Sequence, residues 1–202
     1  MSDESQLQVR PKDGDSSLSL SRVSLIARGR RDAAILTEPP PLKPGDPLSE
    51  TRRLAEEGDA DAQYDLGAEY YDSSDYAEAA KWWRRAAEQG HAQAENALGA
   101  LYSYGEGVTR DFAEAARWFR KAAERGHAVA QCYVSSRYYD GDEVPQDYVQ
   151  AYMWIDLAAS GSTGDDQKTY SSRRGAIAAK MTAQQIAEAQ RLARERRLEL
   201  GR

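Results

Sequence analysis

The chain has 202 residues, of which 33 are acidic and 27 are basic. Its net charge of -6 offers no general attraction to nucleic-acid phosphates, so we expect no nucleic-acid partner. Alanine occurs 33 times, whereas valine, isoleucine and threonine together occur 18 times, which favours an all-α fold because alanine loses no side-chain entropy in a helix. The chain has a single cysteine, which excludes an intrachain disulfide. No apolar run reaches the length of a signal-peptide core or a membrane span, so we expect a cytoplasmic protein with no integral membrane segment.

The first 45 residues differ in composition from the rest of the chain. All eighteen aromatic residues lie between Tyr64 and Tyr170, and six of the seven prolines lie at or before Pro47. Such a segment buries too little apolar surface to offset the entropy of ordering it, so we expect 1–45 to be a disordered or loosely attached tail with a Pro-rich spacer. Apolar and basic residues within it form a short docking motif, a basic amphipathic helix that binds a partner or a membrane, or part of a solvated tail: Arg22, Leu25, Ile26, Arg28, Arg30, Arg31, Ile35 and Leu36.

The folded part is predicted to begin with a capping helix over residues 46–58. Asp46-Pro47-Leu48-Ser49 supplies the cap and first-turn residues that favour a helix start. The sequence Ala55-Glu56-Glu57-Gly58 repeats the pattern of Ala123-Glu124-Arg125-Gly126, so this helix is expected to mimic the second helix of a repeat.

An internal repeat of 36 residues follows the capping helix. Trp82, Trp118 and Trp154 are spaced by 36 twice, and the same spacing relates further residues: Asp75, Asp111 and Asp147, Gly90 and Gly126, and His91 and His127. A fixed period in this range is typical of stacked helical repeats. We expect three repeats over 59–90, 91–126 and 127–161, the first lacking four residues in its central turn.

Each repeat is predicted to be a helical hairpin. The first helix carries apolar residues around a small one, all on one face: Ala62, Leu66, Gly67 and Tyr70, then Ala94, Leu98, Gly99 and Tyr102, then Ala130, Val134, Ser135 and Tyr138. The second helix opens with a capping-box pattern in which Asp75, Asp111 or Asp147 precedes Glu or Gln by three residues. It continues with core residues and ends at glycine: Ala79, Trp82, Ala86 and Gly90, then Ala115, Trp118, Ala122 and Gly126, then Ala151, Trp154, Ala158 and Gly161.

These copies resemble the Sel-one-like repeat, a relative of the tetratricopeptide repeat. The second copy matches best, in Ala94-x-x-x-Leu98-Gly99-x-x-Tyr102-x-x-Gly105-x-Gly107-Val108-x-x-Asp111 and Ala115-Ala116-x-Trp118-Phe119-x-Lys121-Ala122-Ala123-x-x-Gly126. The third copy departs from the pattern with Ser135 for the helix glycine and Glu143 for Gly107. The resemblance covers about residues 50–200 and implies a short right-handed solenoid of stacked helix-turn-helix repeats.

Residues 162–202 are predicted to form C-terminal capping helices. One helix is expected from about Asp165 to Lys180, and Thr182-x-x-Gln185 is a capping box that starts a second over 183–200. The segment from Met181 to Gln190 resembles the closing helix of many bacterial members of the family, so we expect a bacterial source.

Few residues point to chemistry. His91 and His127 occupy equivalent positions just after a glycine, where capping the following helix is a better interpretation than a metal site or an acid–base pair. Cys132 has no additional histidine to activate it, and the Asp–Glu pairs are explained by capping. We therefore predict no metal, no cofactor and no catalytic residue.

With no catalytic or metal site predicted, we expect the function to depend on the protein surface. The resemblance implies that the first helices line a concave groove that binds a protein or peptide partner. The predicted groove residues are Tyr64, Ala68, Tyr71, Asn96, Ala100, Ser103, Tyr104, Cys132, Ser136 and Tyr139; alternatively, Tyr71 and Tyr139 pack between hairpins. The structural repeat positions are Leu66, Gly67, Trp82, Leu98, Gly99, Asp111, Trp118, Asp147 and Trp154. The sequence thus predicts a non-catalytic scaffold or adaptor. The alternative is a regulatory segment of an envelope-associated or signalling system tethered through the tail, and a hydrolase is disfavoured.

Overall fold

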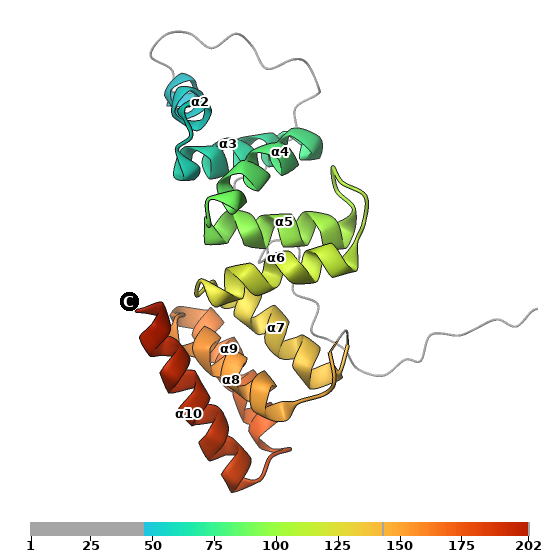
Figure 1. Cartoon of the computed structure of the whole chain (residues 1–202), viewed down its shortest axis with the longest axis vertical. Helices are drawn as coiled ribbons and strands as arrows, with labels where there is room; N and C mark the ends of the chain where they lie inside the picture. The colour runs from blue at the N-terminus through green and yellow to red at the C-terminus, as the bar shows by residue number, and fades with distance from the viewer. Residues whose placement is uncertain (1–46, 143, 202) are drawn as a thin grey trace, which may run out of the picture.

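A computed structural model describes residues 47–142 and 144–201. Within those ranges the chain is all-helical and has no strand (Figure 1). The helices are α2 (Pro47–Glu57), α3 (Ala60–Asp72), α4 (Tyr76–Glu88), α5 (Ala92–Tyr104), α6 (Phe112–Glu124), α7 (Ala128–Asp140), α8 (Tyr148–Ser160), α9 (Gly164–Ala178) and α10 (Ala183–Leu200). The predicted tail 1–45 and its candidate docking motif lie outside the described residues.

The helices stack in chain order as a helical repeat solenoid. From α2 to α9 each helix packs against the next, which gives the hairpins α3–α4, α5–α6 and α7–α8 (Figure 1). At the C-terminal end α10 runs back across α8, and α8 therefore has α7, α9 and α10 around it. The predicted all-α solenoid is confirmed, and the helix expected over 165–180 forms as α9.

The predicted helix caps are present. An aspartate Oδ1 accepts a hydrogen bond from the backbone N–H three residues on at the start of each second helix: Asp75 from Glu78, Asp111 from Glu114 and Asp147 from Gln150. The reciprocal half of the capping box differs from expectation, because Glu78 and Glu114 pair instead with Lys81 and Arg117 on the exposed helix surface. Among the described helices, the complete box forms at Thr182 and Gln185.

The two helices of each hairpin approach closely at one small residue. A Cβ added to Gly67 would lie 2.4 Å from Cδ1 of Trp83, and one added to Gly99 would lie 2.9 Å from the ring of Phe119. In the third hairpin Ser135 occupies this position, and its hydroxyl donates a hydrogen bond of 2.7 Å to the Ala151 carbonyl across the helix pair. The small residue therefore sets the spacing between the helices.

In the first two hairpins, the most buried large side chain of the second helix lies one position after the 36-residue tryptophan pattern. Trp83 and Phe119 are at most 1% exposed, whereas Trp82 is only half-buried. Trp82 packs at the edge of the small cluster formed by α2 and α3, with the Arg85 guanidinium 4.4 Å from its ring centroid. Trp118 is buried as predicted. In the first two hairpins the residue after the periodic tryptophan thus contacts the small position, whereas in the third hairpin Trp154 itself is 1% exposed.

A buried polar residue recurs in the first turn of each first helix. Gln63 donates from Nε2 to the Ala55 carbonyl at 3.0 Å, and Gln131 donates to the Ala123 carbonyl at 3.2 Å. In both cases the acceptor lies eight residues earlier, in the last turn of the preceding helix. This hydrogen bond joins one hairpin to the one before it.

The middle hairpin has a carboxyl group at this position. Glu95 is 1% exposed, and its Oε1 accepts from Nε of Arg125 at 3.1 Å, while Oε2 has no hydrogen-bond partner. The residue eight positions before Glu95 is Ala87, so the register of the other repeats predicts its carbonyl as the acceptor, but an ionised carboxylate has no proton to donate to it. Burial raises the pKa of Glu95 above its usual value, and the positive charge of Arg125 opposes that shift.

We expect Gly67→Ala to destabilise the protein by about 1–3 kcal/mol, because the added methyl group collides with the buried indole of Trp83. Gly175→Ala is the matched control, since Gly175 is an exposed helical residue with no atom near its Cβ direction. It should stabilise the protein by up to about 1 kcal/mol through helix propensity. Urea unfolding followed by circular dichroism measures both, and equal effects of the two changes would contradict the close approach.

We expect Glu95→Gln to raise the free energy of unfolding by about 1 kcal/mol at pH 7, because the amide donates to the Ala87 carbonyl and no buried charge remains. Since the folded-state pKa of Glu95 is raised, the wild-type cost appears as pH rises through that pKa, and the gain shrinks toward pH 4. Gln131→Glu is the reverse change in the next repeat and should destabilise the protein at pH 7. Urea unfolding at both pH values tests the pair.

Candidate functional site

Three residues of the predicted first-helix groove are fully buried. Ala100 and Cys132 have no exposed surface, and Asn96 is 2% exposed. The prediction that they line an open groove is therefore wrong. In α5 every residue from Ala94 to Leu101 is buried, so this helix has no solvent-facing side over its central two turns.

The cause is that an inner helix of a stacked array has neighbours on more than one side. Tyr64, Ala68 and Tyr71 of α3 pack against the core cluster that contains Ala100. Cys132 of α7 lies in a second cluster with residues of α9 such as Tyr170. The face opposite the hairpin core is thus covered by the adjacent repeat or by the cap.

The predicted groove tyrosines pack largely between elements. Tyr64 stacks on His91 of the next repeat with ring centroids 4.8 Å apart, and the Tyr71 hydroxyl lies 3.3 Å from Oε2 of Glu106 in the next turn. Tyr139 lies against Tyr148 of its own hairpin. For these tyrosines the structure favours packing over an open binding surface, although all three residues remain partly exposed.

Two of the predicted groove residues, Ser136 and Tyr139, lie together at a pocket between α7 and α9. Ser103 and Tyr104 at the end of α5 are not part of it: the Ser103 hydroxyl donates to the Gly99 carbonyl, and Tyr104 is 42% exposed. This α7–α9 pocket has a volume of about 280 Å³. It is lined by Ser135, Ser136, Tyr139, Asp140, Ser172, Arg173, Ala176 and Ile177. Ser136 and Tyr139 were predicted from the first-helix face, whereas the α9 half was missed because no repeat pattern relates α9 to the array.

Cys132 lies beside this pocket but is not a reactive thiol. Its Sγ accepts a hydrogen bond from Nη1 of Arg173. Burial raises the pKa of the Cys132 thiol, with the charge of Arg173 opposing the rise. The same environment raises the pKa of Tyr170 to about 12, chiefly through burial. Both groups are neutral at pH 7, and a neutral thiol is a poor nucleophile.

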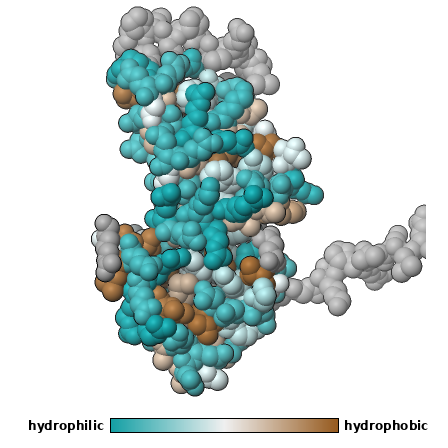
Figure 2. Space-filling model, viewed as in Figure 1, coloured by the Kyte–Doolittle hydropathy of each residue, from teal (hydrophilic) through white to brown (hydrophobic). Residues whose placement is uncertain are grey.

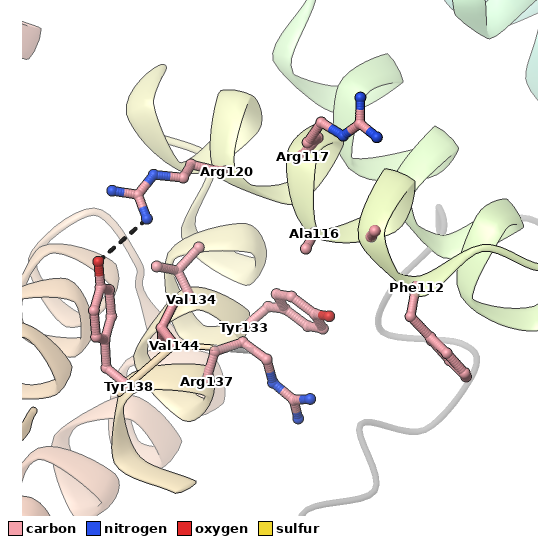
Figure 3. Close-up of a pocket in the computed structure, with 10 residues that line it drawn as sticks. Phe112, Ala116, Arg117, Arg120, Tyr133, Val134, Arg137, Tyr138 and Val144 are labelled. Atoms are coloured by element: carbon pink, nitrogen blue, oxygen red, sulfur yellow. Dashed lines mark hydrogen bonds between the residues drawn. The ribbon is translucent and has the colours of Figure 1, made fainter. Parts of the chain in front are cut away.

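A larger pocket lies between α6 and α7 (Figure 3). This α6–α7 pocket has a volume of about 450 Å³. It is lined by Phe112, Ala113, Ala116, Arg117, Arg120, Tyr133, Val134, Arg137, Tyr138 and Val144. Arg120 donates a hydrogen bond of 3.2 Å to the Tyr138 hydroxyl, and the Arg137 guanidinium lies 5.1 Å from the centroid of the Tyr133 ring. Sequence analysis missed this pocket because its two walls come from different repeats.

The two histidines cap helices, as predicted. Nδ1 of His91 accepts from the Ala94 N–H at 3.2 Å, and Nδ1 of His127 accepts from the Ala130 N–H at 3.4 Å. Nε2 of His91 also lies 3.1 Å from Oδ1 of Asp61. Burial, with a smaller contribution from the nearby His91, lowers the pKa of His127 to about 4. Across the described ranges, no group of three His, Cys, Asp or Glu residues is placed to hold a metal ion.

The surface in view is mostly hydrophilic, and hydrophobic side chains gather on it chiefly over α8 to α10 (Figure 2). Leu198 is 65% exposed and Leu200 is 36% exposed at the end of α10. In the described part of the chain, no helix combines the length and the apolar character that crossing a membrane requires.

Comparison with known proteins identifies the repeats. The Sel1 repeat model matches residues 60–91, 92–127 and 128–162. The solved structure of a protective antigen present in uropathogenic Escherichia coli strains, which displays an SLR fold, is 37% identical with a TM-score of 0.63. That match covers 74% of this chain and 32% of the antigen's, so this chain spans about a third of its relative's length. A Sel1 repeat protein from Oxalobacter formigenes is 33% identical with a TM-score of 0.53, over 65% of this chain and 100% of the other. No curated protein matches the chain.

The capping role of His127 predicts a pH effect on stability. Because its pKa falls from about 6.5 unfolded to about 4 folded, the unfolded chain binds the proton first, and stability is lost as pH decreases through this window. His127→Asn keeps a capping side chain and removes the titration. Relative to this variant, wild type should lose about 3 kcal/mol between pH 7 and pH 4. Parallel loss in both proteins, measured by urea unfolding, would contradict the assignment.

Proposed function

Because the chain belongs to the Sel1 repeat family, we propose that it is a non-catalytic adaptor that holds a protein or peptide partner on its first-helix face. Sel1 repeats generally mediate protein–protein interaction. The antigen and the Oxalobacter protein share the repeat with this chain, and the likeness extends to the fold. The proposal also rests on the surface of this molecule.

The observation that carries the proposal is the α7–α9 pocket. It is where the first-helix face stays open, with Ser136 and Tyr139 on one wall and Ser172 and Arg173 on the other. Hydroxyl groups, a tyrosine and an arginine suit recognition of a polypeptide, because they offer both donors and acceptors beside an apolar surface. Ile177 supplies that apolar surface.

The residues with catalytic potential support binding rather than catalysis. The imidazoles of His91 and His127 are used as helix caps, and the Cys132 thiol is buried and protonated. A hydrolase requires a nucleophile within reach of a base and a group that stabilises an oxyanion. These three residues do not form such a set, since each one is committed to its own helix.

We expect Ser136→Arg to abolish capture of the partner while the protein stays folded, because Ser136 is partly exposed and the new side chain fills the pocket. Ala187→Arg is the matched control, a small exposed residue of α10 changed to the same side chain. Both variants and wild type would be used as bait in lysate of the source cells, with circular dichroism to verify folding and mass spectrometry to identify the captured proteins. A partner held equally by all three would place the binding site elsewhere on the molecule.

A further inference from the structure

The α6–α7 pocket differs from the α7–α9 pocket in position and in charge. Tyr133, Val134, Arg137 and Tyr138 of α7 face the first, and Ser135, Ser136, Tyr139 and Asp140 face the second. At about 100° per residue these two sets project from opposite sides of α7. The α6–α7 pocket is therefore a separate surface, which a change at Ser136 does not touch.

The lining of the α6–α7 pocket is basic and apolar in an acidic protein. Three of its ten lining residues are arginine and none is Asp or Glu, although the chain carries a net charge of -6. Its floor consists of alanine, valine and tyrosine side chains, and Phe112 at its edge is 54% exposed (Figure 3). Arg137 lies beside Tyr133 in this lining, with its guanidinium over the ring (Figure 3).

Each arginine of the pocket has a partner within the chain, and Arg120 has two, the Glu124 carboxylate and the Tyr138 hydroxyl. Arg117 pairs with Glu114 at 3.1 Å and Arg120 with Glu124 at 3.3 Å, and both guanidinium groups are about half or more exposed. Exposed pairs of this kind contribute about 0–1 kcal/mol, so an incoming carboxylate competes with them at little cost. Arg137 contacts the exposed Asp142 at 3.4 Å, and its Nε is buried with no hydrogen-bond partner. Because Nε is buried, a peptide carboxylate reaches Arg137 through its terminal Nη atoms, in competition with the exposed Asp142.

We infer that the α6–α7 pocket is a docking site for an acidic peptide segment that carries an aromatic or long aliphatic anchor. The anchor enters the apolar floor beside Tyr133 and Phe112. The volume of the pocket, about 450 Å³, lies in the range of ligand pockets. A neighbouring carboxylate of the peptide receives hydrogen bonds from Arg137, whose planar fork matches a carboxylate in two-point contact. Arg117 and Arg120 attract further acidic residues along the rim.

A displayed library of random twelve-residue peptides, selected against the full chain, tests this inference directly. Enriched peptides should combine acidic residues with an aromatic or long aliphatic residue, and the affinity of the best one should fall as salt increases. Arg137→Gln should weaken its binding at least tenfold. Arg194→Gln, the same change at an exposed residue of α10, should weaken it less than twofold.

A second pair of variants separates charge from folding. Ala113 is exposed at the pocket edge in the first turn of α6. An acidic or a basic side chain is therefore accommodated at this position without loss of packing. Ala113→Glu should weaken the acidic peptide at least fivefold by repulsion, whereas Ala113→Lys should leave its affinity unchanged or increase it. The inference would be overturned if the library yielded no binding peptide or only peptides without acidic residues. It would also be overturned if binding of the best peptide were insensitive to both Arg137→Gln and Ala113→Glu.

Discussion

The contact between a small residue on each first helix and a large side chain on the second determines the rest of the structure. At Gly67 and Gly99 no Cβ fits without displacing an aromatic ring, so the two helices of a hairpin lie as close as the backbone permits. Close approach buries the indole of Trp83 and the ring of Phe119 completely. Burial of a large aromatic side chain contributes about 1.5–3 kcal/mol or more, far above the roughly 1 kcal/mol that glycine costs in a helix.

Polar contacts then fix how one hairpin sits on the next. The Gln63 and Gln131 amides each bond to a carbonyl of the preceding helix, and they do so from buried positions where a lost partner is expensive. At the equivalent position of the middle hairpin, Glu95 pairs instead with Arg125 of the same hairpin, and this contact depends on the protonation of Glu95. Helix starts are fixed by local bonds, including those of the two histidines, so each hairpin has its boundaries set independently of its neighbours.

Much of the fold could be predicted from the sequence because it is encoded locally. The aspartate caps, the histidine caps and the small position on each first helix are short-range patterns that recur at a fixed spacing. Burial by a neighbouring repeat is not local, and so Ala100 and Cys132 were placed on a groove although adjacent elements cover them. Both pockets have walls from two elements, and the α6–α7 pocket joins residues as far apart as Phe112 and Val144. No single repeat unit contains that information.

Helix α8 has a consequence for synthesis of the chain. Nine consecutive residues of α8, from Ala151 to Ala159, are buried, and Asp156 is the charged residue among them. That carboxylate is held by Arg174 of α9 and Arg197 of α10, both of which follow α8 along the chain. At about 5–20 residues per second, α8 leaves the ribosome ~2–8 s before Arg197 does. During that interval its apolar surface is available to chaperones or to other nascent chains, and α10 ends the exposure by closing over it.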